Sequence, residues 1–285
     1  MPKKPQHQPY PSAPMFSRSQ KPVQEDDSPK LPPEKIKRIQ QIVGSLLFYG
    51  RAINLTIIKT LNTLGTQQSS PTEETDRRVL QFIDYCATHP DAKIRFFASD
   101  MLLQVHSDAA YMNKTKARST ASGHFFLGNK IYQNKPIFLN GAVHTLCKII
   151  GVAASAAEAE LGSLFLNAQD TIKIRIALDE MGHKQPPTPI HTNNSTANSI
   201  IHQTIRQQRS CAMNMRYFWT IDKQNDNTID VSWHPGRENL GDYSSKHHPP
   251  SVHKHLRPTY LHTTGSPRYL QRSLAPHLLR GCVNT

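Results

Sequence analysis

The stretch Val105–His106–Ser107–Asp108–Ala109–Ala110–Tyr111 decides the fold prediction for this chain. It follows a strand-like run from Met101 and places a carboxylate, Asp108, where that run ends. Strand-like runs also stand before and after it, at residues 93–97 and 123–128. Together these runs predict an antiparallel meander with Asp108 on or beside its first or second strand. A single aspartate at a strand end is most often a turn former or a helix cap, so its meaning depends on acidic residues later in the chain.

The composition favours a polyanionic partner. The chain has 285 residues, with 34 Lys plus Arg against 21 Asp plus Glu and a net charge of +13 at pH 7. Nucleic acid is the first candidate, and a generically basic surface is the alternative. The four cysteines are far apart and form no CxxC pair, which is typical of reduced cysteines in an intracellular protein. Without a signal-peptide pattern or a long apolar run, we expect the cytoplasm or nucleus and no membrane partner.

The chain divides by composition into four parts. Residues 1–33 and 249–285 are rich in Pro and basic or His residues, and we predict that both are disordered. Apolar residues at helical spacing predict three helices in residues 34–91, with no catalytic constellation. Residues 92–248 begin with strands and continue with helices at about 155–168 and 170–181, then further strands and helices. The prediction is an α/β fold in which helices flank a mixed sheet, preceded by a small helical segment.

Acidic or amide residues stand at predicted strand ends and helix starts, at Asp108, Glu158, Asn193 and Asp242. Each has a structural explanation when taken singly; Glu158, for example, lies in a first helical turn, where the helix dipole favours a carboxylate. The order of the elements and these positions resembles the ribonuclease H fold. In-line hydrolysis of a phosphodiester uses two divalent cations about 3.5–4 Å apart. Mg²⁺ requires oxygen ligands, which explains clustered carboxylates.

Local motifs resemble the C-terminal part of copia-type retrotransposon Pol polyproteins. Residues 43–49 and 80–85 look like the segment beyond the polymerase active site and the connecting helix that follows it. Further blocks in the family's order resemble its ribonuclease H motifs: HSDA at 106–109, KARSTASGHFFLG at 116–128, SAAEAEL at 155–161 and ENLGDYSSK at 238–246. The resemblance covers about residues 34–260. It implies a fragment that contains the end of a reverse transcriptase region (34–91) and a ribonuclease H-like domain (92–248). The polymerase Y-x-D-D element is missing.

The resemblance implies that Asp108, Glu158 and Asp242 are catalytic and bind Mg²⁺ or Mn²⁺. The fourth metal ligand of the family is an Asp in a D-N-x-x-A element, and that position is occupied here by Asn193 in HTNNSTA, 191–197. An amide is a neutral, weaker ligand and cannot supply the lost charge. We therefore expect weakened metal binding and impaired hydrolysis of RNA in RNA–DNA hybrids.

Two functions remain open at this point. One is a metal-dependent ribonuclease acting on RNA–DNA hybrids, with Arg118, His124 and Arg216 as candidate backbone contacts. The other is a catalytically inactive nucleic-acid-binding remnant or domesticated element that keeps the fold and the basic surface. The His-rich residues 247–255 are expected to be a solvated tail rather than a metal site. His234 is either a mobile proton carrier or a surface turn histidine, and the second is favoured.

Overall fold

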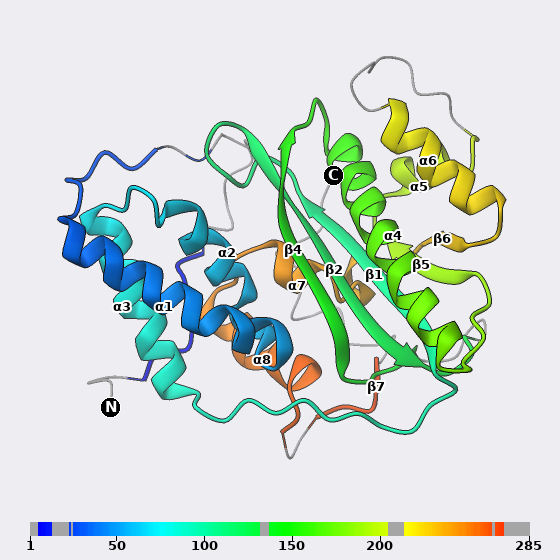
Figure 1. Ribbon diagram of the computed structural model, residues 1–285, viewed down its shortest axis with the longest axis horizontal. Coiled ribbons are helices and arrows are strands. Elements are labelled where there is room, and N and C mark those ends of the chain that lie inside the picture. Colours follow the sequence, from blue (N-terminus) through cyan, green and yellow to red (C-terminus); the bar gives the residue numbers. More distant parts are fainter. Residues whose placement is uncertain are drawn as a thin grey trace.

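The computed structural model describes residues 5–12, 23, 25–131, 137–204, 214–263 and 266–270. A group of helices precedes the sheet, as the apolar spacing predicted, and lies to one side of it in Figure 1: α1 (Pro33–Ala52), η1 (Leu55–Ile57), α2 (Ile58–Gln67) and α3 (Glu73–Thr88). The helices share an apolar core that includes the fully buried Ile39, Leu61 and Phe82. The Thr72 hydroxyl caps α3 by accepting a hydrogen bond from the Thr75 backbone N–H.

The main sheet has five strands: β1 (Leu102–Ala110), β2 (Arg118–Gly128), β4 (Ala142–Val152), β5 (Thr188–Thr192) and β6 (Ile229–Trp233). Their order is β4-β2-β1-β5-β6. The first three pair antiparallel, whereas β5 runs parallel to β1 and β6 runs parallel to β5. A short second sheet pairs β3 (Ile137–Phe138) with β7 (Tyr269–Leu270). The predicted fold class is confirmed: the protein is α/β, with helices flanking a mixed sheet (Figure 1).

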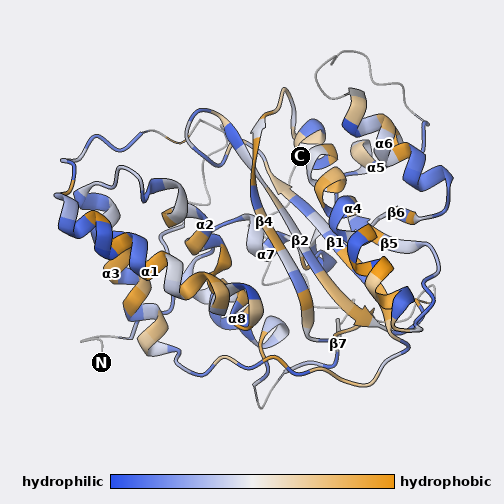
Figure 2. Cartoon of the chain, viewed as in Figure 1, coloured by the Kyte–Doolittle hydropathy of each residue, from blue (hydrophilic) through white to orange (hydrophobic). Residues whose placement is uncertain are grey.

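Helices cover both faces of the sheet. The long helix α4 (Ala156–Glu180) packs on one face, where Asn167 lies against Gly123 of β2. The short helix α7 (Asp242–Ser245) packs on the other face, where the Ser122 hydroxyl donates to the Gly241 carbonyl. The remaining helices of this half are α5 (Ser195–Ile201), α6 (Asn214–Asn225) and the turn η3 (Gly236–Glu238). Figure 2 shows hydrophobic stretches along the central strands and hydrophilic stretches on α6 and in the connecting loops.

Two local predictions are wrong. Residues 93–97 do not form a strand, because the Asn140 side chain bonds the Phe97 backbone N–H and carbonyl in place of a neighbouring strand. The meander therefore consists of β1, β2 and β4, and Asp108 lies within β1 opposite Ser122. The two helices expected at 155–168 and 170–181 form the single helix α4. Asp170 does not break it, since its carboxylate lies on the surface and pairs with Lys173.

The predicted disorder of the two ends is wrong for several described segments. Residues 250–260 form helix α8 (Pro250–Tyr260), because a proline is well suited to the first turn of a helix. Tyr260 stacks on Tyr243 with 4.4 Å between ring centroids, and its hydroxyl donates to the Leu240 carbonyl at 2.9 Å. Near the other end, the Gln6 backbone N–H donates to Thr88 Oγ1 at 2.9 Å. Residues 1–4, 13–22, 24, 264–265 and 271–285, for which disorder was also predicted, lie outside the described residues.

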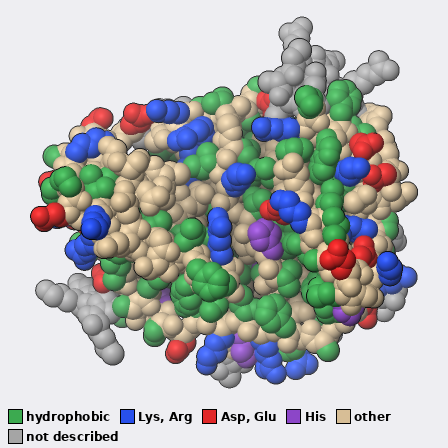
Figure 3. Space-filling view, in the orientation of Figure 1, with side chains coloured by type: hydrophobic (Ala, Val, Ile, Leu, Met, Phe, Trp, Pro, Cys, Tyr) green, Lys and Arg blue, Asp and Glu red, His purple; other side chains and the backbone are tan. Residues whose placement is uncertain are grey.

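The surface charge is spread widely. Figure 3 shows Lys and Arg side chains scattered across the visible face rather than gathered in one patch. None of the helices in the described part of the chain combines the length and hydrophobicity that a membrane span requires.

Candidate functional site

Asp108 and Asn193 meet at one edge of the sheet. Asn193 directly follows β5, which runs parallel to β1, so the carboxyl ends of both strands lie together. The Asn193 amide Nδ2 donates a hydrogen bond to Asp108 Oδ1 at 3.1 Å. Asp108 is 1% exposed, and its Oδ2 has no hydrogen-bond partner among the described residues. Burial, and then the nearby Asp242 carboxylate, raise the pKa of Asp108 to about 6.

Asp242 is brought to the same place by a turn that packs on β1. The Asn239 amide anchors this turn by donating to the Ser107 carbonyl at 2.7 Å. A Cβ atom on Gly241 would lie 2.9 Å from the His106 carbonyl oxygen, so only glycine allows the turn to approach this closely. The Lys246 ammonium forms an ion pair with Asp242 Oδ1 one helical turn later. Asp108 and Asp242, together with Glu160 described next, are called the acid cluster. This cluster therefore contains its own cation, Lys246.

The structure brings Glu160, rather than Glu158, next to Asp108. Glu158 lies at the start of α4, where its carboxylate accepts a hydrogen bond from the Ala154 backbone N–H. Glu160 is 5% exposed, and its carboxylate accepts a hydrogen bond from the Ala109 backbone N–H. Burial, and then the Asp108 charge, hold the pKa of Glu160 well above its usual range.

Helical spacing in the sequence could have shown that Glu160 faces the sheet. Glu160, Leu164, Asn167 and Thr171 are all buried and follow one another at intervals of four, three and four residues, so they share the side of α4 that faces the sheet. Glu158 lies two positions earlier, about 200° away around the helix. In the motif AEAEL, the second glutamate therefore faces Asp108.

The residues as placed do not fit a divalent metal. Among the residues that the structure describes, no three His, Cys, Asp or Glu side chains are arranged to hold a metal ion. A metal needs oxygen acceptors, yet Asn193 turns its N–H₂ donor toward Asp108, and the Lys246 ammonium binds Asp242. Asp108 Oδ2 and Glu160 Oε2 are buried and have no hydrogen-bond partner in the described part of the chain. A proton on Glu160, which its raised pKa favours, offsets part of the charge of this cluster.

The three candidate hybrid contacts have other partners. The Arg118 guanidinium donates to the Thr115 carbonyl at 3.2 Å, and the Arg216 guanidinium lies over the Phe165 ring at 5.7 Å. His124 is only 4% exposed and packs against the Phe126 and Tyr260 rings. A buried ring cannot reach a nucleic-acid backbone, so the prediction for His124 is wrong.

The His-rich stretch is partly buried rather than a solvated tail. His247 Nε2 lies 3.0 Å from Thr63 Oγ1, and His253 Nδ1 lies 2.7 Å from the Tyr243 hydroxyl. Burial lowers the pKa of His253 to about 3. Both side chains help to pack the chain after α7 against the helices that precede the sheet. His234 packs edge-on against His191 with 3.9 Å between ring centroids.

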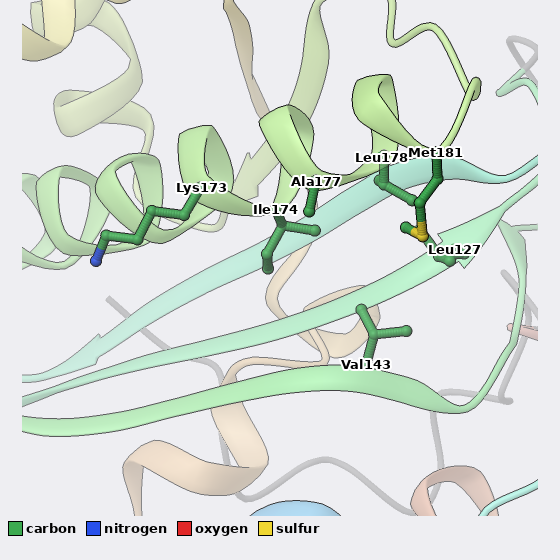
Figure 4. Close-up of a pocket in the computed structure, with 7 residues that line it drawn as sticks. All are labelled: Leu127, Val143, Lys173, Ile174, Ala177, Leu178 and Met181. Atoms are coloured by element: carbon green, nitrogen blue, oxygen red, sulfur yellow. The ribbon is translucent and has the colours of Figure 1, made fainter.

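An apolar pocket lies apart from the acid cluster, between α4 and the strands β2 and β4 (Figure 4). Its lining is Leu127, Val143, Lys173, Ile174, Ala177, Leu178 and Met181. The single charged side chain, Lys173, is already paired with Asp170. Because binding sites usually combine an apolar wall with convergent polar groups, the acid cluster is the better candidate site.

Similarity to known proteins extends only to solved structures. No protein-family model matches the chain, and no curated protein matches it significantly. LC11-RNase H1 in complex with an RNA/DNA hybrid overlaps 48% of this chain and 88% of its own, at 10% identity and a TM-score of 0.35. The N-terminal ribonuclease H domain of a Mycobacterium tuberculosis protein overlaps 49% and 92%, at 9% identity and a TM-score of 0.35. A foamy viral protease-reverse transcriptase in complex with dsDNA overlaps 50% and 90%, at 12% identity and a TM-score of 0.33.

The fold is ribonuclease H-like. Three antiparallel strands followed by two parallel strands, with α4 on one face, make up the arrangement expected of that fold. Activity, metal binding and ligand depend on the residues of the acid cluster.

A buried polar network beneath Asp108 leaves no room for a side chain at position 123. The Asn167 amide donates to the Ser122 carbonyl at 2.9 Å, and a Cβ atom on Gly123 would lie 1.8 Å from Asn167 Oδ1. We expect Gly123→Ala to lower the free energy of unfolding by about 2–4 kcal/mol, because Asn167 must move out of its network. Urea titration measures this. Gly151→Ala is the control, since a Cβ there meets nothing within 4 Å; an equal loss in both variants would contradict the packing argument.

Proposed function

We propose that this chain is a nucleic-acid-binding remnant or domesticated form of a copia-type retroelement ribonuclease H domain, in which metal-dependent hydrolysis of RNA–DNA hybrids is impaired. The ribonuclease H-like fold, the net charge of +13 and the ordered copia-like motifs support this origin and partner. Phosphate contacts of basic side chains account for sequence-independent binding.

The hydrogen bond from Asn193 to Asp108 carries the proposal for impaired hydrolysis. A metal ligand at this position would offer an oxygen, whereas the Asn193 amide offers hydrogen atoms to the buried carboxylate. The Lys246 ammonium provides a positive charge at Asp242. Asn193 therefore occupies an oxygen of Asp108, and Lys246 offsets the charge of Asp242, at carboxylates that would otherwise attract a cation.

Asn193→Asp is expected to make the acid cluster responsive to metal. The change replaces a donor 3.1 Å from Asp108 Oδ1 with a second carboxylate. Without divalent ions, like-charge repulsion lowers the melting temperature of the variant. Mg²⁺ or Mn²⁺ restores it, whereas the wild-type protein responds little. Cleavage of a labelled RNA–DNA hybrid is expected to be absent or slow in the wild type and faster in the variant.

Asp108→Asn provides the matched control for cleavage, because it keeps the size of the side chain and removes the charge. Wild-type cleavage that disappears in Asp108→Asn would contradict the proposed impairment and indicate a working nuclease. A folded wild-type protein that binds neither hybrid nor single strands would count against the nucleic-acid function itself.

A further inference from the structure

We propose that Trp233 is a stacking platform for an unpaired nucleotide base beside the acid cluster. The proposal rests on the proposed nucleic-acid function and narrows its ligand class. The preferred ligand is single-stranded nucleic acid, or a hybrid with a single-stranded end.

Two hydrogen bonds connect the Trp233 ring to Asp108 through a single residue, Asn193. Trp233 is the last residue of β6 and pairs with Thr192 of β5, so it lies next to Asn193. Its indole Nε1–H donates to the Asn193 carbonyl at 3.1 Å, and the Asn193 side chain in turn donates to Asp108. The ring is thereby fixed on the residue that donates a hydrogen bond to the buried carboxylate.

Trp233 is 49% exposed in spite of this anchor. Other large apolar side chains are more exposed, among them Phe48 on α1 and Met215 and Phe218 on α6. Phenylalanine and methionine have no side-chain N–H or O–H donor, whereas the indole N–H of Trp233 holds its ring on the backbone of Asn193. A ring whose edge is held and whose surface is open is preorganised, so ordering it on binding costs little entropy.

A neighbouring cation favours nucleic acid over a protein partner. The η3 turn begins against Asn193, since a Cβ atom on Gly236 would lie 3.3 Å from Asn193 Nδ2. The next residue, Arg237, has a half-exposed side chain, and its Nε forms a long ion pair of 3.8 Å with Oε1 of the buried Glu238. An aromatic surface with an exposed guanidinium nearby can receive a base and its phosphate together.

Stacking on a side chain requires a base whose face is free. Inside a duplex, neighbouring base pairs cover both faces of each base, and a blunt end leaves free only the outer face of its terminal pair. In a single strand, or at a single-stranded end, the base is accessible, and stacking tolerates any sequence because every base has a π-face. We therefore expect the protein to prefer unpaired over paired nucleic acid and to show no preference for a base sequence.

The test compares the full chain with Trp233→Ala and Trp233→Phe on three labelled probes: a single-stranded RNA, a hybrid with a single-stranded end and a blunt hybrid. Fluorescence anisotropy gives each Kd at several salt concentrations. We expect Trp233→Ala to weaken binding of the two probes with unpaired bases by about 5- to 100-fold. Blunt-hybrid binding should change less than about 3-fold, and the salt slope should stay constant because no phosphate contact is lost. Trp233→Phe keeps an aromatic ring but loses the N–H anchor, so its affinity should lie between those of the wild type and Trp233→Ala.

Phe218→Ala controls for the loss of an exposed aromatic ring, and it is expected to bind like the wild type. Intrinsic fluorescence gives a second measurement, since the chain has two tryptophans and Trp219 packs its ring edge-on against Phe165. Unpaired bases should quench the wild-type signal and leave that of Trp233→Ala unchanged.

Several outcomes would overturn the proposal. Unchanged affinity of Trp233→Ala for unpaired bases refutes stacking while leaving the nucleic-acid function intact. An equal loss on the blunt hybrid would indicate a general role in binding. Self-association that Trp233→Ala abolishes would assign the ring to a protein interface. A wild-type protein that binds no probe refutes both the stacking and the nucleic-acid function.

Discussion

The protein is expected to unfold in mild acid, between about pH 5.5 and 4.5, because its fold buries neutral histidines. Burial lowers the pKa of His124 to about 4, and burial and then the neighbouring His234 lower that of His191 to about 3. The same direction holds for the other buried histidines, His106, His247, His248 and His253. Below pH 6.5 the unfolded chain binds protons that the folded chain cannot accept.

The sign of the effect follows from proton counting. Each proton bound only by the unfolded state removes about 1.4 kcal/mol of stability per pH unit as the pH falls from 6.5 toward the folded pKa. Asp108 and Glu160 act in the opposite direction, because their raised pKa values let the folded state hold protons in the same window. The histidines outnumber them, so stability falls by several kcal/mol over one to two pH units. Urea titrations at pH 7, 6 and 5 measure this.

His124→Leu isolates the contribution of one histidine. The side chain is buried against Phe126 and Tyr260, so an apolar replacement keeps the packing. Below pH 6.5, we expect the free energy of unfolding of this variant to fall less steeply, by about 1.4 kcal/mol per pH unit, which corresponds to one proton. The pH at which half of the protein is unfolded should move downward. The exposed His255 provides the control as His255→Leu. An unchanged slope in His124→Leu would show that this ring takes up its proton without unfolding.

Lys59→Met is expected to stabilise the protein by about 2–3 kcal/mol at pH 7. Lys59 is 5% exposed, and its Nζ donates to the Thr120 hydroxyl at 2.8 Å. Among the described residues, no carboxylate forms an ion pair with Lys59 or with the nearby Lys114. Burial lowers the pKa of Lys59 to about 8, and burial and then Lys59 lower that of Lys114 to about 7. Methionine fills the same space without the charge.

The pH dependence distinguishes this explanation from better packing. With a folded pKa near 8 and an unfolded value near 10.5, the unfolded state binds the extra proton between them, so wild-type stability rises with pH in that range. Lys59→Met lacks the part of this rise that Lys59 contributes, whereas Lys114, with a folded pKa of about 7, contributes its own part in both proteins. The comparison is clearest from about pH 8 to 9. Lys148→Met is the control, because Lys148 lies exposed on β4. A loss of stability in Lys59→Met would mean that the Thr120 hydrogen bond outweighs the buried charge.

The order of strand-like and helical stretches predicted the α/β class, and the resemblance to ribonuclease H implied that Asp108, Asn193 and Asp242 lie near one another. Short strand-like runs marked β1 and β2, and parallel strands place their carboxyl ends on one edge. The choice between Glu158 and Glu160 could have been made from helical spacing. The burial of His253 and Tyr260 could not, because Pro-rich and His-rich composition is the same in a tail and in a helix that docks through ring contacts.

The sequence by itself determined most of the order of strands and helices, the basic charge and the amide at position 193, because each depends on residue type and spacing along the chain. Only the tertiary structure decided which atoms of these residues face one another. The direction of the Asn193 N–H₂ group toward Asp108, the ion pair of Lys246 with Asp242 and the anchoring of Trp233 on Asn193 join residues from separate strands and turns. Such contacts depend on side-chain orientation and burial after the sheet has assembled, and no local pattern records them.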